Sequence, residues 1–188
     1  MILENWFSTP IWYTKIQCDL TQVKQKCYQL KNEGEGVHKS NFGGWQSKTI
    51  NLTDYEEFKE LTQLINENLN NVCKDIHEDF KLLINGAWVN INGKNSYNYT
   101  HEHPFSALSG CFYIDVPENS GNIVFENMHS LKRHYPINTF NSPLFYENTT
   151  YKPDVGSLII FPSWINHKVE TNNSDNDRIS IAFNTTQF

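Results

Sequence analysis

The sequence lacks long apolar runs and is poor in cysteine. No apolar run approaches the roughly 18 residues that a membrane-spanning helix needs, and the first residues, MILENW, show neither the basic region nor the apolar core of a secretory leader. The four cysteines (Cys18, Cys27, Cys73 and Cys111) stand far apart without a CxxC pair, which favours buried thiols over a zinc knuckle or a disulfide framework. These absences predict a cytoplasmic protein without membrane contact.

Positive charge is also scarce. Lys and Arg number 15 against 21 Asp and Glu, which gives a net charge of −6. A protein that grips nucleic acid broadly needs basic side chains to neutralise phosphates, so the composition disfavours nucleic acid as a partner. A length of 188 residues suits one domain with a closed core and is short for two. We therefore expect a single domain over residues 1–188.

Two segments in the first half of the chain, 19–33 and 53–80, carry a helical period, and together they predict a helical N-terminal cover over 1–81. TDYE at 53–56 has the pattern of a capping box and should start the second helix. The apolar face of this helix is expected to consist of Phe58, Leu61, Ile65, Leu69, Val72 and Ile76. Residues 41–48, between the helices, contain glycine and aromatic side chains, which is typical of a loop or an edge strand.

The pattern changes near Leu82 to short β-rich runs bounded by Gly, Pro and Asn. We expect strands near 83–91, 96–102, 107–116, 121–126, 144–151, 157–162, 165–170 and 178–185. Strands without intervening helices cannot form βαβ units, so this mainly β core over 82–188 should be antiparallel, as a sandwich or jelly roll. The helices would then pack outside one sheet, and 127–143 would be a long loop that is functional or mobile.

The clearest candidate for chemistry is the segment NYTHEHP at 98–104. On a strand, His101 and His103 share one face and can aim both imidazoles at one point, while Glu102 points away. His167 alternates with aliphatic neighbours and should therefore point inward. Three imidazoles suit a borderline first-row metal and leave coordination positions open for substrate and oxygen. The alternative interpretation is a surface pair of histidines and one hydrogen-bonded core histidine.

A second candidate is the last strand, RISIAFN at 178–184. Its aliphatic and aromatic residues alternate on one face, so Arg178 and Ser180 share the other face. If that face lines the interior, the guanidinium is buried, which is costly unless an anion pairs with it. A small dicarboxylate could supply a bidentate partner. The alternative is an internal salt bridge of Arg178, for example to Asp115 or Glu126.

Taken in order, these motifs resemble the Fe(II)/2-oxoglutarate-dependent oxygenases. The segments that carry the resemblance are WVN at 88–90, HEHP at 101–104, LSG at 108–110, FPSW at 161–164 and RISIAFN at 178–184. They are most similar to the 2-oxoglutarate oxygenases found in marine bacteria and cyanophages, and the resemblance spans about 82–185. It implies a double-stranded β-helix, which is a cupin-like jelly roll, and a location in the host cytoplasm if a phage encodes the chain.

The resemblance also implies roles for the cosubstrate site. Arg178 would bind the distal carboxylate of 2-oxoglutarate, assisted by Ser180. Tyr113 is similar to the tyrosine that some members of the family place on the same carboxylate. Asn90 could meet the 1-carboxylate of 2-oxoglutarate or the substrate.

At the metal, the resemblance implies that His101 and His167 are iron ligands. The superfamily usually has an aspartate or glutamate two residues after the first histidine, and this sequence has His103 there. A neutral imidazole in place of a carboxylate leaves one more positive charge on Fe(II), which should strengthen 2-oxoglutarate chelation. Glu102 cannot readily replace the missing carboxylate, because it faces the opposite side of a regular strand.

The implied reaction uses Fe(II), 2-oxoglutarate and O2 to hydroxylate an unidentified small-molecule or peptide substrate, with release of succinate and CO2. Two other classes stay open: a three-histidine cupin-type dioxygenase without 2-oxoglutarate, and a non-enzymatic jelly-roll binding module. Self-association as a homodimer is also left open. We expect the segments 127–150 and 41–48 to border the substrate pocket, with His129 and His134 facing solvent or substrate rather than the metal.

Overall fold

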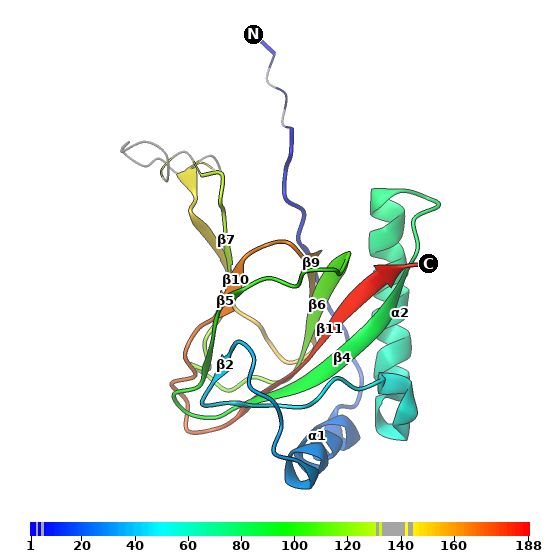
Figure 1. The fold of residues 1–188 in the computed structure, drawn as a ribbon, viewed down its shortest axis with the longest axis vertical. Helices are drawn as coiled ribbons and strands as arrows, with labels where there is room; N and C mark the ends of the chain where they lie inside the picture. Colours follow the sequence, from blue (N-terminus) through cyan, green and yellow to red (C-terminus); the bar gives the residue numbers. More distant parts are fainter. Residues whose placement is uncertain (3, 5, 131, 133–141, 143–144) are drawn as a thin grey trace.

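Two antiparallel sheets form the centre of the computed structural model, which describes residues 1–2, 4, 6–130, 132, 142 and 145–188 (Figure 1). The larger sheet has the strand order β1 (Trp12–Lys15), β9 (Ser157–Pro162), β6 (Leu108–Asp115), β11 (Arg178–Gln187), β4 (Leu82–Asn92) and β3 (Trp45–Gln46). The smaller sheet has the order β2 (Asn41–Phe42), β5 (Tyr97–His101), β10 (His167–Val169), β7 (Ile123–Glu126) and β8 (Asn148–Tyr151). The predicted mainly β, antiparallel double-stranded β-helix is confirmed.

Strand β11 of the larger sheet has one apolar side and one polar side. On β11, the side chains of Ile179, Ile181 and Phe183 are fully buried in the main core cluster. Arg178 and Ser180 alternate with them and line a cavity between the sheets. Fully burying an aliphatic or aromatic side chain contributes about 1.5–3 kcal/mol, so this apolar face fixes which residues of β11 turn inward.

The helix α2 (Lys59–Ile76) covers the outer, apolar face of the larger sheet (Figure 1). Five of the six apolar residues expected on this face are buried: Phe58, Leu61, Ile65, Leu69 and Val72. The expectation was wrong for Ile76, whose side chain is 45% exposed. Ile76 is the last residue of α2, and the chain turns away immediately after it, at the extended His77.

The start of this helix also differs from the expected capping box. The hydroxyl of Thr53 donates to the Asn51 carboxamide oxygen at 3.0 Å instead of accepting from a helix amide. Two short 3₁₀ turns, η1 (Leu52–Asp54) and η2 (Glu56–Phe58), therefore precede α2. The extended backbone of Tyr55 separates the two turns, so TDYE does not begin the α-helix.

The N-terminal 81 residues do more than form a helical cover. They contain α1 (Thr21–Glu33), but they also supply the three edge strands β1, β2 and β3. The sequence did not predict β1, because three of its four residues are exposed and no alternation of apolar residues marks it. The segment 41–48, expected to be a loop or an edge strand, forms the short edge strands β2 and β3.

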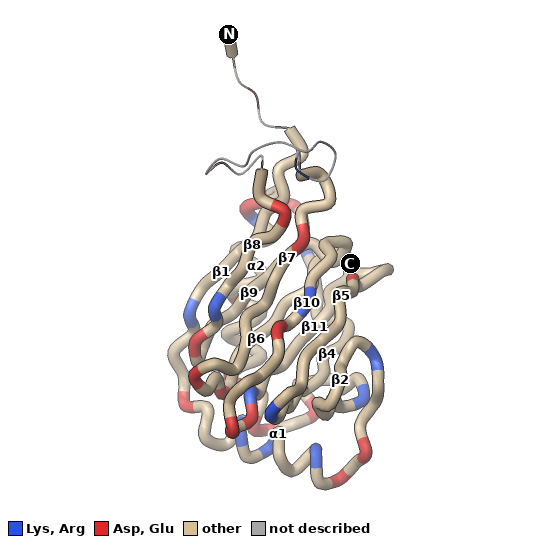
Figure 2. Tube along the Cα trace, turned by 90° about the vertical axis from the view of Figure 1, so that its left-hand side faces the viewer, with Lys and Arg blue, Asp and Glu red and all other residues tan. Residues whose placement is uncertain are grey.

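Several strands are shorter than expected. The strand expected at 96–102 ends at His101, and the one expected at 165–170 is only His167–Val169. Most of the expected loop at 127–143 lies outside the described residues. Figure 2 shows acidic and basic residues interspersed, with many of them in loops at the ends of the strands. No helix in the described part of the chain combines the length and apolar character needed to cross a bilayer.

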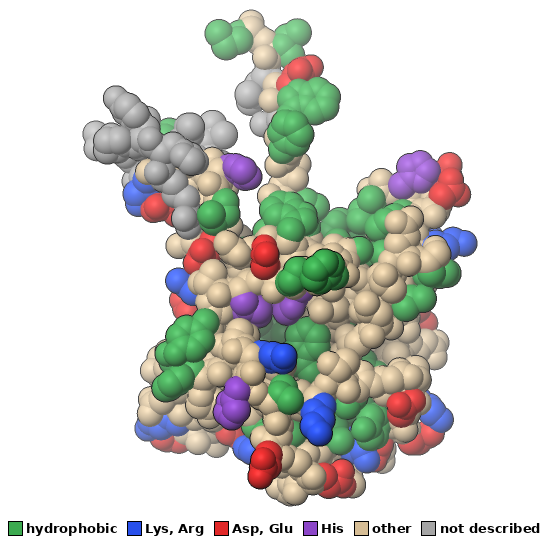
Figure 3. All heavy atoms as spheres, in the orientation of Figure 1, with side chains coloured by type: hydrophobic (Ala, Val, Ile, Leu, Met, Phe, Trp, Pro, Cys, Tyr) green, Lys and Arg blue, Asp and Glu red, His purple; other side chains and the backbone are tan. Residues whose placement is uncertain are grey.

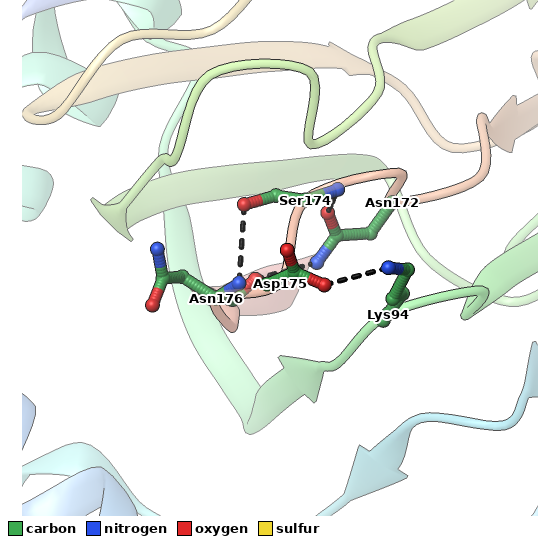
Figure 4. A network of polar contacts seen from close by, with 5 residues as sticks. All are labelled: Lys94, Asn172, Ser174, Asp175 and Asn176. Carbon is green, nitrogen blue, oxygen red and sulfur yellow. Dashed lines mark hydrogen bonds and ion pairs between the residues drawn. The ribbon is translucent and has the colours of Figure 1, made fainter.

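The loop between β10 and β11 is held by a polar network (Figure 4). The Asn172 side chain donates to the backbone carbonyls of Asn92 at 2.7 Å and Asn176 at 2.9 Å. Its oxygen accepts from the backbone N–H of Ser174 at 2.9 Å, and Lys94 pairs with Asp175 at 2.6 Å. These bonds fix the loop to the end of β4 and so set where β11 begins.

Candidate functional site

Three histidines meet at one point between the two sheets. His101 ends β5 and His167 begins β10, and the two are direct partners in the strand register. Their rings lie 4.3 Å apart, and the ring of His103 lies 5.1 and 5.0 Å from them. The potential ligand atoms of all three lie within 4.8 Å of one another. Figure 3 shows histidine side chains on the wall of a hollow in this face of the molecule.

His103 reaches this point by a different route from the expected one. The sequence placed His101 and His103 on one strand, but β5 ends at His101. The backbone N–H of His103 instead donates to the carbonyl of Ser163 at 2.9 Å, and its ring packs against Trp88 at 5.5 Å. A contact with the loop after β9 therefore orients His103, rather than the alternation of side chains along a strand.

Backbone carbonyls fix the tautomers of two of these histidines. Nδ1 of His101 donates to the Tyr99 carbonyl at 2.7 Å, and Nδ1 of His167 donates to the Ile165 carbonyl at 3.0 Å. A carbonyl can only accept, so in both rings the proton is on Nδ1 and the lone pair is on Nε2. Metal-binding histidines are commonly oriented through such a bond to the second ring nitrogen.

Burial keeps all three imidazoles neutral. It lowers the pKa of His101, and burial together with the neighbouring His101 lowers the pKa of His103 to about 4 and that of His167 to about 3. Among the described residues, the group that these histidines form contains no carboxylate, and Glu102 is exposed outside it. Three neutral imidazoles with open positions fit a first-row divalent metal such as Fe(II).

Ser40 contacts this group, although no pattern in the sequence singles it out. Its hydroxyl lies 3.3 Å from Nε2 of His101, and it donates there because Nδ1 carries the ring proton. The hydroxyl oxygen also accepts from the Asn98 carboxamide at 3.1 Å. Because Nε2 has a single lone pair, a metal that binds His101 must displace the Ser40 hydroxyl.

Arg178 is a buried cation that forms no ion pair with a described residue, although the carboxylate of Glu170 acts on it electrostatically and opposes the lowering of its pKa by burial. Its side chain is 2% exposed, and its guanidinium donates to the carbonyl of Ser120 and, at 3.5 Å, to that of Glu170. In the described part of the chain no carboxylate lies within ion-pair distance of it. The two alternatives pair elsewhere, Asp115 with Lys24 and Glu126 with Lys168. Burial removes water from the guanidinium and lowers the pKa of Arg178. An anionic ligand bound to the guanidinium would offset the free-energy cost of this desolvation.

The residues around Arg178 are suited to binding a carboxylate. Ser180 and Tyr113 are paired in register on β11 and β6, and both line the same cavity of about 740 Å³ as the three histidines. Burial raises the pKa of Tyr113 well above its ordinary value, so the phenol stays protonated and can donate. Asn90 is paired with Ser180 from β4 and also lines the cavity.

Other expectations fall outside this group. His129 is exposed, with its backbone N–H bonded to the Asn127 side chain at 3.0 Å, and it lies outside the histidine group. His134 lies outside the described residues. The segment 41–48 does border the cavity, through Gln46. Ser40, just before this segment, also lines the cavity, although no sequence pattern marks it.

Residues 86–184 match the sequence model of the family described as "Putative 2OG-Fe(II) oxygenase". This chain belongs to the 2OG-Fe(II) oxygenase family. Fe(II) is therefore its metal and 2-oxoglutarate its cosubstrate, and the chain is an oxygenase. A search among curated proteins finds no match.

Several solved structures share the fold of this chain. A prolyl-4-hydroxylase from Pseudomonas putida is similar with a TM-score of 0.70 at 12% identity, over 96% of this chain and 94% of that one. The viral collagen prolyl hydroxylase of Paramecium Bursaria Chlorella virus-1, in complex with 2-oxoglutarate, gives 0.55 at 17% identity, over 92% and 94%. HygX from Streptomyces hygroscopicus, with nickel and 2-oxoglutarate bound, gives 0.62 at 12% identity, over 94% and 82%.

Proposed function

We propose that this oxygenase hydroxylates a C–H bond of a small-molecule or peptide substrate, with a three-histidine iron site and 2-oxoglutarate held by Arg178. The observation that carries the proposal is that one cavity is lined by three neutral imidazoles and by a buried guanidinium that forms no ion pair with a described residue. Because both groups line one cavity, a dicarboxylate could chelate the metal at one end and pair with the guanidinium at the other. We also propose that the chain forms a single domain. Its proposed location is the cytoplasm, which would be that of a host cell if a phage encodes the chain.

The iron ligands in this proposal are Nε2 of His101 and His167 and one ring nitrogen of His103. The Nδ1 bonds to backbone carbonyls hold the first two rings in place before the metal arrives. Because the pKa values of these histidines are lowered, no proton has to leave them at neutral pH when the metal binds. His103 takes the position that a carboxylate usually occupies, so the protein contributes no negative charge to the iron.

The 2-oxoglutarate site in this proposal lies on the larger sheet. Arg178 binds the distal carboxylate, which supplies the missing anion. Ser180 and the protonated Tyr113 donate hydrogen bonds to the same carboxylate, and Asn90 contacts the 1-carboxylate or the substrate. Together with O2, bound Fe(II) and 2-oxoglutarate supply the oxidising chemistry, in which one oxygen atom enters succinate, CO2 leaves, and the other oxygen atom enters the substrate C–H bond.

The environment of Arg178 also favours this proposal over the two other classes. A three-histidine dioxygenase without 2-oxoglutarate would leave the buried guanidinium with carbonyl partners alone. A jelly-roll binding module would have no use for three neutral imidazoles gathered on one cavity, and it would not turn over 2-oxoglutarate.

The test is a titration of the anaerobic Fe(II) protein with 2-oxoglutarate. The charge-transfer absorption of the Fe(II)–2-oxoglutarate complex reports binding. Arg178→Ala should keep the metal but lose affinity for 2-oxoglutarate by roughly 30-fold to several thousand-fold, the cost of removing one partner of a buried charged pair. Arg178→Lys should recover part of this loss, because a lysine contact is not bidentate. Equal 2-oxoglutarate binding by Arg178→Ala and wild type would refute the proposed site.

A further inference from the structure

A row of polar side chains crosses four neighbouring strands on the cavity side of the larger sheet. In register, Gln46 of β3 is paired with Asn90 of β4, Asn90 with Ser180 of β11, and Ser180 with Tyr113 of β6. All four residues line the cavity that the three histidines also line. Tyr113 and Ser180 at one end belong to the proposed 2-oxoglutarate site, whereas nothing has yet been assigned to Gln46 at the other end.

The carboxamide of Gln46 is buried but unpaired. Gln46 is 8% exposed, and its backbone is held in place by the N–H of Val37, which donates to the Gln46 carbonyl at 2.8 Å. Within the described residues, no hydrogen bond reaches its side-chain oxygen or nitrogen, and these polar atoms are not sealed from the cavity. Buried carboxamides are normally hydrogen-bonded, so this one is free to bind a ligand in the cavity.

Gln46 lies too far along the row to serve the cosubstrate. Adjacent strands are about 4.8 Å apart, so two strand spacings put Gln46 roughly 10 Å from Ser180. The carbon chain of 2-oxoglutarate spans roughly 5 Å from one carboxyl carbon to the other. That chain must also reach the histidines, which come from the smaller sheet side of the cavity. A 2-oxoglutarate molecule bound to Arg178 and Ser180 therefore leaves Gln46 to the substrate.

We propose that Gln46 is a specificity-determining residue that recognises an amide group of the substrate, either a peptide bond or a carboxamide. The inference rests on the proposed function. The Gln46 carboxamide has an N–H₂ donor and a C=O acceptor. An amide of the substrate has a C=O that accepts from the N–H₂ and an N–H that donates to the C=O. A carboxylate would leave the donors of Gln46 paired but its oxygen without a partner. Trp88, which also lines the cavity and packs on His103, provides a flat aromatic surface beside this position.

The first measurement separates Gln46 from the cosubstrate site. Titration of the anaerobic Fe(II) protein with 2-oxoglutarate should give Gln46→Leu the affinity of wild type within about twofold, while Ser180→Ala binds more weakly. A Gln46→Leu variant that loses as much 2-oxoglutarate affinity as Ser180→Ala would place Gln46 in the cosubstrate site and overturn the inference. Failure of the wild type to bind 2-oxoglutarate would instead refute the proposed function.

The second measurement tests the amide. The probes are N-methylamides of simple carboxylic acids and the matching methyl esters, which have no N–H donor, and the readout is succinate formed from 2-oxoglutarate. We expect an amide to stimulate wild type more than its ester, and Gln46→Leu to reduce this preference by about tenfold, the loss typical of a buried hydrogen-bonded pair. Gln46→Asn should retain part of the preference. Equal stimulation by amides and esters, no stimulation by any amide, or an unchanged preference in Gln46→Leu would each overturn the inference.

Discussion

The larger and the smaller sheet line the same cavity with different side chains, and different interactions fix the positions of those side chains. The larger sheet presents Arg178 and Ser180 from β11, one of the longest strands, whose opposite face is locked into the core under α2. The smaller sheet presents His101 and His167 from the ends of short strands, and it orients them through side-chain bonds to backbone carbonyls. Strand register therefore positions the residues proposed to bind the cosubstrate, whereas local hydrogen bonds position two of the proposed metal ligands.

The largest expected effect comes from breaking the smaller-sheet side. His101→Ala, His103→Ala and His167→Ala should each weaken Fe(II) binding by more than about 100-fold, because even the loss of an outer-shell partner of a ligand costs 10- to 100-fold. Titration with Fe(II) under anaerobic conditions measures this. Glu102→Ala is the matched control and should bind as wild type does, because Glu102 lies outside the histidine group. Tight binding by His103→Ala would mean that only two histidines hold the metal.

A change on the larger sheet should leave the metal in place and affect only the cosubstrate. Tyr113→Phe removes one hydroxyl from a buried position, and hydrogen bonds to charged groups are worth about 1.5–3 kcal/mol, so 2-oxoglutarate affinity should fall roughly 10- to 100-fold. The charge-transfer titration measures this loss, and Fe(II) affinity is the internal control. If Tyr113→Phe weakened Fe(II) binding instead, the two sheets would not contribute separately to metal and cosubstrate binding.

Ser40 belongs to the smaller-sheet side of this comparison, because it lies just before β2 and its hydroxyl contacts His101, a proposed metal ligand. Ser40→Ala removes a donor that competes with the metal for Nε2 of His101, so metal binding should become about 2- to 13-fold tighter, the worth of one ordinary hydrogen bond. Ser40→Thr keeps the hydroxyl and should restore wild-type affinity. Ser174→Ala, which removes a hydroxyl from the network of Figure 4, is the control. Weaker or unchanged binding by Ser40→Ala would contradict the competition.

The smallest effect is expected from mild acid. Three histidines with the ordinary pKa of about 6.5 would lose on the order of 10⁴-fold in metal affinity between pH 7 and pH 5. The lowered pKa values of His103, about 4, and His167, about 3, keep these two ligands unprotonated over that range. Metal titrations at pH 5 and pH 7 should therefore differ far less. A loss near 10⁴-fold would show that the histidines titrate normally.

The same shifts have a consequence for the metal-free protein, with a definite sign. The unfolded chain takes up protons on these histidines as the pH falls through about 6.5, but the folded chain resists protonation until lower pH. The free energy of unfolding should therefore fall as the pH drops from 6.5 toward 4. Urea unfolding at several pH values checks this, and the slope should shrink in His167→Ala.

Much of the fold followed from the sequence because it depends on local alternation. The inward face of β11 could be read from the apolar residues at 179, 181 and 183, and the α2 face from its helical period. The two ends of α2 could not be predicted from the sequence. The Thr53 hydroxyl donates to the Asn51 side chain instead of capping the helix, and the helix ends at Ile76. Strand β1 was missed because it is an exposed edge strand, held by its pairing with β9.

The sequence by itself determined which residue types face inward, since alternation along a strand is a local property: Arg178 and Ser180 share a face wherever β11 lies. Only the tertiary structure decided that His103 is turned toward the other histidines, since a bond to Ser163 from a distant loop orients it. It also brought Ser40 to His101 and Gln46 into line with Asn90. Those contacts join residues far apart in the chain, and their positions depend on sheet register and loop packing, which no local pattern of residues encodes.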